Sequence, residues 1–139
     1  MIVQKRLYDT GRDSNNKKLV TDSFRKILTD HYSDSTVIDK KSKGRKFSNV
    51  TLKNDGNFYT SMTIKGYADF YEFKANFDKD DGNIADNFEL SYPSPEQFTK
   101  AILSLSDEEQ TELNQKVIIP KYRELFEIVM SDAIGKARA

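Results

Sequence analysis

The sequence has no cysteine and no tryptophan, one histidine and three prolines. The lack of cysteine excludes disulfide bonds, a catalytic thiolate and any zinc site built from thiolates. Long apolar runs are also missing: the longest clear aliphatic run, Val117–Ile119, has three residues, whereas a membrane-spanning helix needs roughly 20. No segment resembles a signal peptide. We therefore expect a cytoplasmic protein that is not secreted and does not contact a membrane.

Charge is balanced over the whole chain but not along it. Residues 1–53 carry 13 Lys or Arg and 6 Asp or Glu, whereas residues 54–139 carry 9 and 16, so the two parts have net charges of +7 and −7. This asymmetry gives a dipolar surface if the fold separates the two parts, and it cancels if the fold interleaves them. Nine Phe and seven Tyr supply core material for one domain spanning 1–139.

Alternating apolar and polar residues predict an antiparallel sheet over residues 47–92. The expected strands are 47–53, 57–65, 67–77 and 84–92, joined as a meander. A three-residue turn ending at Gly56, with this glycine in the left-handed conformation, keeps Leu52 and Phe58 on one face. A two-residue turn would place Leu52 on the wrong face, so the longer turn is favoured.

Helices are expected on both sides of the sheet. Residues 1–18 form an arm and loop, and 19–32 form an amphipathic helix with apolar residues at helical spacing. Helices then occupy 95–134. The class is therefore α+β: a four-stranded antiparallel meander, preceded by one helix and followed by two to three C-terminal helices packed mainly on one face.

The C-terminal helices have clear start and stop signals. Ser94 precedes Pro95, and Ser106 with Glu109 forms a capping-box pattern. Pro120 is expected to break or kink the chain, and Gly135 is a plausible helix stop.

The strongest sign of nucleic-acid binding is a basic run that leads into the aromatic-rich sheet. Lysine and arginine attract phosphates, and exposed rings on a sheet can stack on bases. An acidic protein partner would suit the same charges. The residues that would carry this binding are Lys40, Lys41, Lys43, Arg45, Lys46, Tyr59 and Phe70. The competing interpretation is a solvated loop, with the rings filling a core or a protein interface.

Two acidic patterns invite a metal-ion interpretation. Asp78, Asp80, Asp86 and Glu89 match several offsets of the helix–loop–helix calcium motif, but the position that requires glycine is Asn83. Glu72 and Lys74, together with an acidic residue earlier in the chain, resemble the pattern of carboxylates and lysine in some metal-dependent nucleases. The composition of the chain explains the occurrence of this pattern equally well. An acidic hairpin loop without a metal is favoured for the first pattern.

The last expected helix carries the strongest apolar stripe of the chain. Tyr122, Phe126 and Met130 lie on the same side as Leu125 and Val129. The stripe either packs on the sheet or, if it exceeds what a sheet face covers, forms an oligomer or partner interface.

No catalytic constellation is found: His31 has no recognisable nucleophile to serve, and the glycines form no phosphate loop. We expect no cofactor and no enzymatic activity. The leading hypothesis is a binding or assembly protein that uses the C-terminal helical surface and the outer sheet face for a protein partner or self-association. Its excess of Lys over Arg, 16 to 6, is typical of AT-rich genomes, including phages and mobile elements. The alternatives are a nucleic-acid-binding protein and, third, a divalent-metal-dependent enzyme.

Overall fold

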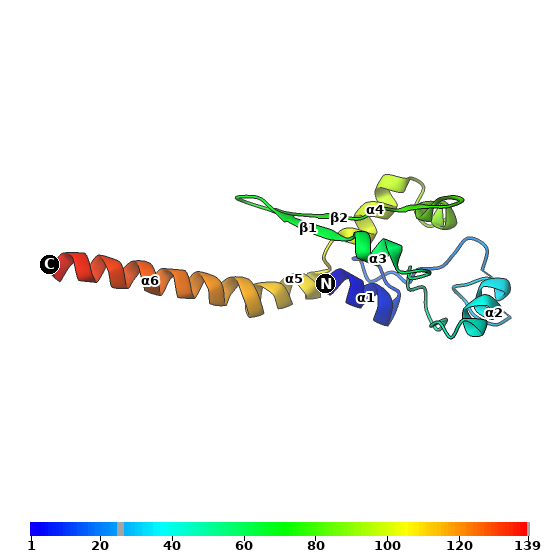
Figure 1. Cartoon of the computed structure of the whole chain (residues 1–139), viewed down its shortest axis with the longest axis horizontal. Helices are drawn as coiled ribbons and strands as arrows, with labels where there is room; N and C mark the ends of the chain where they lie inside the picture. The colour runs from blue at the N-terminus through cyan, green and yellow to red at the C-terminus, as the bar shows by residue number, and fades with distance from the viewer. Residues whose placement is uncertain (25–26, 139) are drawn as a thin grey trace. The chain divides into compact units, whose positions relative to one another are not determined.

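The computed structural model describes residues 1–24 and 27–138 (Figure 1). These residues group into two compact units, Met1–Ser104 and Leu105–Ala139, which we call unit 1 and unit 2 and describe separately. The expectation of a single domain stays a prediction. No helix in the described ranges is long and apolar enough to cross a membrane.

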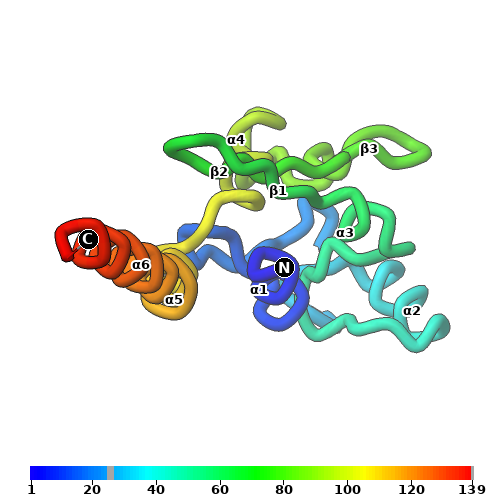
Figure 2. Tube along the Cα trace, turned by 60° about the vertical axis from the view of Figure 1, so that its left-hand side comes forward, coloured from blue at the N-terminus to red at the C-terminus, as the bar shows by residue number. Residues whose placement is uncertain are grey.

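Unit 1 combines short helices with two small antiparallel hairpins. In chain order its elements are α1 (Ile2–Thr10), α2 (Asp34–Ser42), α3 (Asn57–Ser61), β1 (Thr63–Gly66), β2 (Tyr71–Lys74), β3 (Asp78–Lys79), β4 (Gly82–Asn83), the 3₁₀ helix η1 (Ile84–Phe88) and α4 (Pro95–Leu103). β1 pairs with β2 and β3 pairs with β4. Figures 1 and 2 show α4 on the same side of the unit as the hairpins, with α1 and α2 on the other side.

The core of unit 1 is a cluster of aromatic rings around Phe98 of α4, whose side chain is fully buried. The Phe88 ring stacks on Phe98 at 5.0 Å, and Tyr92 and Phe77 meet it edge-on at 5.4 and 5.7 Å. Phe58 of α3 extends the cluster through Phe77, at 5.0 Å. Such pairs stabilise a fold beyond the area they bury. The cluster therefore joins α3, the segment leading into β3, η1 and α4 into one core.

A buried carboxylate attaches the N-terminal loop to this core. Asp13 is 1% exposed, and its Oδ1 accepts hydrogen bonds from the backbone N–H of Asn15 and Lys17, at 2.9 and 2.8 Å. Its Oδ2 accepts from the hydroxyl of Tyr92 at 2.7 Å. A buried charge needs such complete pairing. Ser14 N also donates to the carbonyl of Ala101, at 2.9 Å, which fixes the loop on α4.

α1 is held against the C-terminal end of α4 by one side chain. Arg6 Nη2 donates to Ile102 O at 2.6 Å, and its Nη1 donates to Ser104 O at 3.0 Å. The final carbonyls of a helix lack intrahelical donors and carry partial negative charge. The guanidinium thus caps α4, while Val3 and Leu7 bury the inner face of α1.

Unit 2 is a continuous helical run: α5 (Asp107–Leu113), the π-helical turn η2 (Asn114–Ile118) and α6 (Ile119–Arg138) (Figure 1). Pro120 lies just after the π turn. Proline has no N–H to donate, and its ring clashes with the carbonyl four residues earlier. The wider π turn relieves this clash. The expected break or kink at Pro120 therefore takes the form of one π-helical turn within a continuous helical run.

The four-stranded meander over 47–92 is not confirmed. Residues 47–53 form no strand, 57–61 form α3, and 84–88 form η1. Only the pairing of 63–66 with 71–74 preserves part of the predicted alternation, with Ile64 opposite Phe73. Gly56 does have positive φ, 95°, but it begins α3 and no hairpin turn forms there. The strand prediction from local alternation was wrong here, because aromatic residues at every second position can also be buried by helices or irregular segments.

Two N-terminal predictions are also wrong. The described residues of 19–32 contain turns and bends, the expected arm forms α1, and a further helix, α2, forms between them and the predicted sheet. Leu19 and Tyr32 are buried as the pattern implied, but Leu28 is half exposed, so the apolar residues do not share one helical face.

The C-terminal capping signals are confirmed. Ser94 Oγ accepts from Gln97 N, Pro95 opens α4, and Ser106 with Glu109 forms a reciprocal capping box at α5. Gly135 does not stop α6, which continues to Arg138. These helices were predictable because their signals act within one turn of the chain.

Gly11 and Gly44 offer a matched test of packing, since both have a φ of +61°. A methyl group at Gly11 would lie 2.8 Å from Val50 O and from Asn49 Nδ2, whereas at Gly44 it would meet nothing within 4 Å. We expect Gly44→Ala to lower the free energy of unfolding by about 1 kcal/mol, through the left-handed conformation alone. Gly11→Ala should lower it by roughly 1–3 kcal/mol more. Urea denaturation measures both, and equal losses would contradict the packing described here.

Alkaline pH should destabilise unit 1. Burial, and then the hydrogen bond to Asp13, raise the pKa of Tyr92 above its ordinary value near 10, and burial likewise raises the pKa of Tyr59. Both hydroxyls must stay protonated in the folded chain but ionise near pH 10 when unfolded. Their stabilisation is therefore complete below about pH 10 and is lost as the pH rises further. The melting midpoint should fall as the pH rises above about 10, and less steeply for Tyr92→Phe. A flat profile in both proteins would refute this.

Candidate functional site

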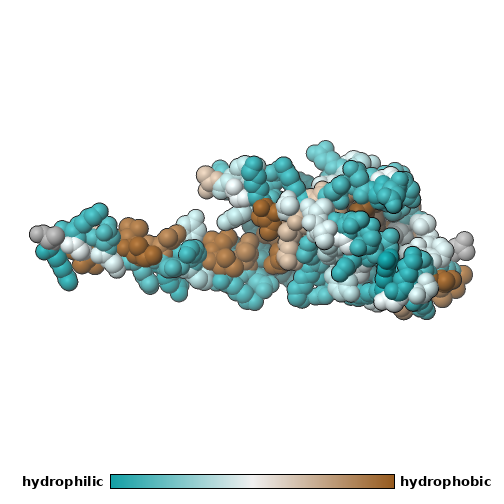
Figure 3. Space-filling view, viewed as in Figure 1, coloured by the Kyte–Doolittle hydropathy of each residue, from teal (hydrophilic) through white to brown (hydrophobic). Residues whose placement is uncertain are grey.

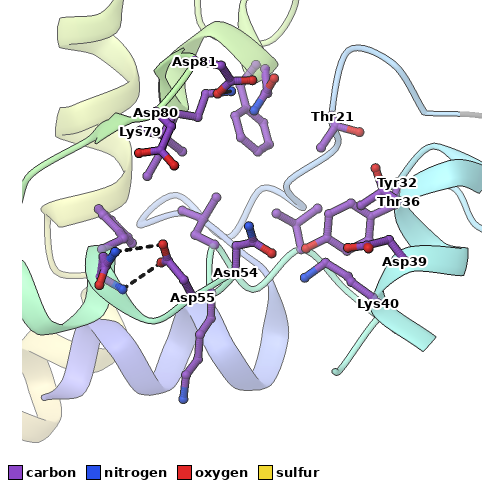
Figure 4. A pocket seen from close by; sticks show the side chains of 18 of the residues that line it. Thr21, Tyr32, Thr36, Asp39, Lys40, Asn54, Asp55, Lys79, Asp80 and Asp81 are labelled. Carbon is purple, nitrogen blue, oxygen red and sulfur yellow. Dashed lines mark hydrogen bonds and ion pairs between the residues drawn. The ribbon is translucent and has the colours of Figure 1, made fainter. Parts of the chain in front are cut away.

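A polar cleft in unit 1, which we call the α2 cleft, has a volume of about 670 Å³. Its walls come from α2, from segment 50–58 and from the β3–β4 turn with η1. Figure 4 shows Tyr32, Thr36, Asp39 and Lys40 on one side and the β3–β4 turn on another. The size lies in the range of small-molecule sites. Leu52 lines the cleft with a φ of +53°, a strained conformation for leucine.

Lys40 is the most unusual side chain in this cleft, because it is charged and only 5% exposed. α2 begins at its Ser33 cap and buries Val37 and Lys40, which are one turn apart. The Nζ of Lys40 lies 5.0 Å from the centre of the Tyr32 ring, a favourable cation–π contact. Burial chiefly, and then the charge of Arg45, lower the pKa of Lys40, while Asp39 opposes the shift.

The other wall is acidic. Asp80 and Asp81 form the tip of the β3–β4 hairpin, and Asp55 lies below them across the cleft (Figure 4). Lys79 pairs with Asp81 at 3.3 Å. Asp55 accepts from the N–H and Nδ2 of Asn57, at 2.9 and 2.8 Å. Asp80 is exposed, and no hydrogen bond or ion pair holds its carboxylate within the described residues.

The predicted basic surface is largely engaged in contacts within the chain. Lys43 pairs with Asp39 at 2.7 Å, and Arg45 donates to Asn54 Oδ1 at 2.7 Å. Lys46 donates to Tyr8 O at 2.8 Å. Lys41 Nζ lies 4.9 Å from the Phe47 ring centre, and Lys40 is buried. Nucleic-acid binding through these residues stays a prediction.

The two rings expected on an outer sheet face lie in different surroundings. Tyr59 is a buried residue of α3, not a strand residue, and its hydroxyl donates to Thr51 O. Phe70 is 54% exposed at the end of the β1–β2 hairpin, where it stacks on Tyr67 at 4.4 Å. The structure therefore does not place Tyr59 and Phe70 on a common stacking surface.

The acidic residues considered for metal binding have separate roles. Asp78 begins β3 and Asp80 lies at its turn, while Asp86 accepts from Asn83 N at 2.8 Å in the η1 capping box. Glu89 follows η1. In the described part of the chain, no three His, Asp or Glu side chains come together as a metal site. Glu72 pairs with Lys74 at 3.3 Å on β2. Whether a cation binds the acidic turn stays untested.

His31 serves the fold of unit 1. The side chain is 3% exposed, with Nδ1 2.9 Å from Asp30 Oδ1 and Nε2 2.8 Å from Phe47 O. The hydrogen bond from His31, and then that from Lys18, hold the pKa of Asp30 well below its ordinary value. Both ring nitrogens are therefore occupied by structural contacts.

The third predicted surface is the apolar stripe of α6. The side chains of Tyr122, Phe126 and Met130 are 70%, 65% and 44% exposed. Figure 3 shows apolar residues gathered along this helix. Unit 2 consists of one helical run, so it contains no second element that could cover the stripe.

The cleft itself was missed by sequence reasoning. Lys40 was noted only as part of a basic run, and Asp80 only as a metal candidate. The available signal was the Ser33 cap followed by Val37, which places Lys40 on the inner face of a helix. The acidic wall had no local signal, since it comes from a hairpin about 40 residues further along the chain.

Comparisons with known proteins give no family for this chain. No protein-family model, curated protein or solved structure matches it.

Proposed function

We propose that the protein is a non-catalytic assembly protein whose α6 stripe pairs with the same stripe of a second copy. The observation that carries this proposal is the exposure of the stripe along a helix that has no covering element in its own unit. Helices of this kind gain most of their stability from packing an apolar face. A contiguous exposed apolar patch is typical of an interaction site.

The spacing along α6 favours a helix as the partner. Ile119, Tyr122, Phe126, Val129 and Ala133 follow one another at alternating intervals of three and four residues. This is the spacing of the a and d positions in a coiled coil, and it gives a narrow seam that fits another helix. The polar side is stabilised by intrahelical ion pairs, such as Lys121–Glu124 at 3.0 Å and Lys136–Asp132 at 3.1 Å.

Charge favours a second copy in the antiparallel orientation. The helical run begins with Asp107, Glu108 and Glu109, and its last turn contains Lys136 and Arg138. An antiparallel register that pairs Tyr122 with Phe126 of the second copy brings Glu112 opposite Lys136. Opposite charges then meet at both ends of the pair, and complementary flanking charges of this kind select partner and orientation.

Phe126→Glu should convert the assembled protein to a monomer, because it places a carboxylate in the centre of the apolar seam. Ser131→Glu is the matched control, since residue 131 lies on the opposite face of the same helix. Light scattering behind a sizing column gives the mass of each protein at low and high salt. We expect the wild type and Ser131→Glu to form a salt-resistant dimer, and Phe126→Glu to be a monomer.

Circular dichroism provides the second readout for the same three proteins. Loss of the partner should reduce helicity in Phe126→Glu, because α6 is then left with an unpaired apolar face. A wild-type monomer at every concentration would reject self-association. An unchanged dimer in Phe126→Glu would show that the stripe is not the contact.

A further inference from the structure

The side chain of Lys40 has a buried stem and ends in an ammonium at the α2 cleft. The residue is only 5% exposed, and its nitrogen points into the cleft (Figure 4). Among the described residues no hydrogen bond or ion pair to this nitrogen is found, and its one specific contact is the Tyr32 ring. The fully buried polar atoms that lack a partner in the described residues do not include this nitrogen, so it is accessible from the cleft. A ligand oxygen in the cleft would supply a charged hydrogen bond to it.

The nearby carboxylates do not supply it. Asp39, the neighbour in sequence, is engaged with Lys43 at 2.7 Å, and Asp55 is engaged with Asn57. Arg45 raises the local positive charge and lowers the pKa of Lys40, and it donates to Asn54. The α2 side of the cleft therefore favours a small anionic group.

The opposite side excludes a ligand that is only anionic. Five Asp and three Lys line the cleft, a net charge of −2. Lys79 is paired with Asp81, and Lys53 lies over the rings of Tyr8 and Tyr59. The carboxylate of Asp80 remains free to face a ligand. A phosphate-rich ligand would be repelled, whereas a cationic group would be attracted and could bind bidentately.

We propose that the α2 cleft binds a basic amino acid, with its carboxylate on Lys40 and its side-chain cation facing Asp80 and Asp55. Such a molecule carries one anionic and one distal cationic group, separated by a short apolar chain. Its net positive charge matches the negative cleft. Val50, Leu52 and Phe58 supply apolar lining for the chain between the two groups. All of these residues belong to unit 1, so the proposal is independent of self-association through α6.

L-arginine and agmatine separate the two contacts, because agmatine lacks the carboxylate and keeps the guanidinium. The full chain is titrated with each compound by ¹H–¹⁵N NMR. Arginine should bind saturably and shift the amide signals of α2 and the β3–β4 turn. Lys40→Met should weaken arginine binding by roughly 10- to 100-fold, the loss expected for a charged hydrogen bond. The same variant should leave agmatine binding unchanged or tighter.

Asp80→Asn is the matched variant on the other wall, at an exposed turn residue whose carboxylate makes no hydrogen bond or ion pair within the described residues. It should weaken the binding of both arginine and agmatine. The binding of acetate, which has no cationic group, should not be weakened. Absence of arginine binding at about 10 mM would overturn the proposal. So would equal arginine affinity in Lys40→Met, or inorganic phosphate that competes as well as arginine does.

The stability of Lys40→Met is a readout that needs no ligand. Methionine keeps the apolar stem, and its sulfur replaces the ammonium in the contact with the Tyr32 ring, so the melting midpoint of the free protein should change little. Arginine should raise the midpoint of the wild type and not that of Lys40→Met. A marked fall for Lys40→Met would show that the ammonium has a structural partner, and would reject the assignment of a ligand to it.

Discussion

Burial of the Phe98 ring is the constraint on which unit 1 depends. Three rings meet it from η1, from the segment after η1 and from the residue before β3, and a fourth links α3 through Phe77. The regular elements around it are short, so none could be stable by its own hydrogen bonds. The aromatic cluster supplies the common surface on which they pack. Asp13 and Arg6 then attach the N-terminal loop and α1 to the same helix, α4.

The α2 cleft is a consequence of this arrangement. The rings hold η1 and the β3–β4 hairpin on one side, while Tyr32 and Val37 anchor α2 on the other. The irregular segment 50–58 joins the two sides, and Leu52 adopts its strained backbone there. A fold built from short elements leaves a concave space at such a junction. Its chemical character comes from an ammonium on one wall and an unpaired carboxylate on another, two opposite charges that one wall alone would not provide.

Unit 2 follows a different principle, since a single helical run has no core of its own. Ion pairs and a capping box stabilise its polar side, whereas Tyr122, Phe126 and Val129 form an exposed seam that no other element of unit 2 covers. Pro120 is tolerated because the π turn before it widens the helix. The protein as proposed thus combines a ligand-binding unit, stabilised by rings, with an assembly helix.

Features that depend on contacts within a few residues can be read from the sequence. The caps at Ser94 and Ser106, the stripe of α6, the positive φ of Gly56 and the mixed α+β class all follow from local hydrogen bonds, sterics and periodicity. Packing between distant segments sets the rest: Tyr59 belongs to a helix, residues 47–53 form no strand, and Lys40 and Asp80 line the same cleft. Rings at alternating positions can be buried by a sheet or by an irregular cluster, and the choice depends on which distant side chains fill the space around Phe98.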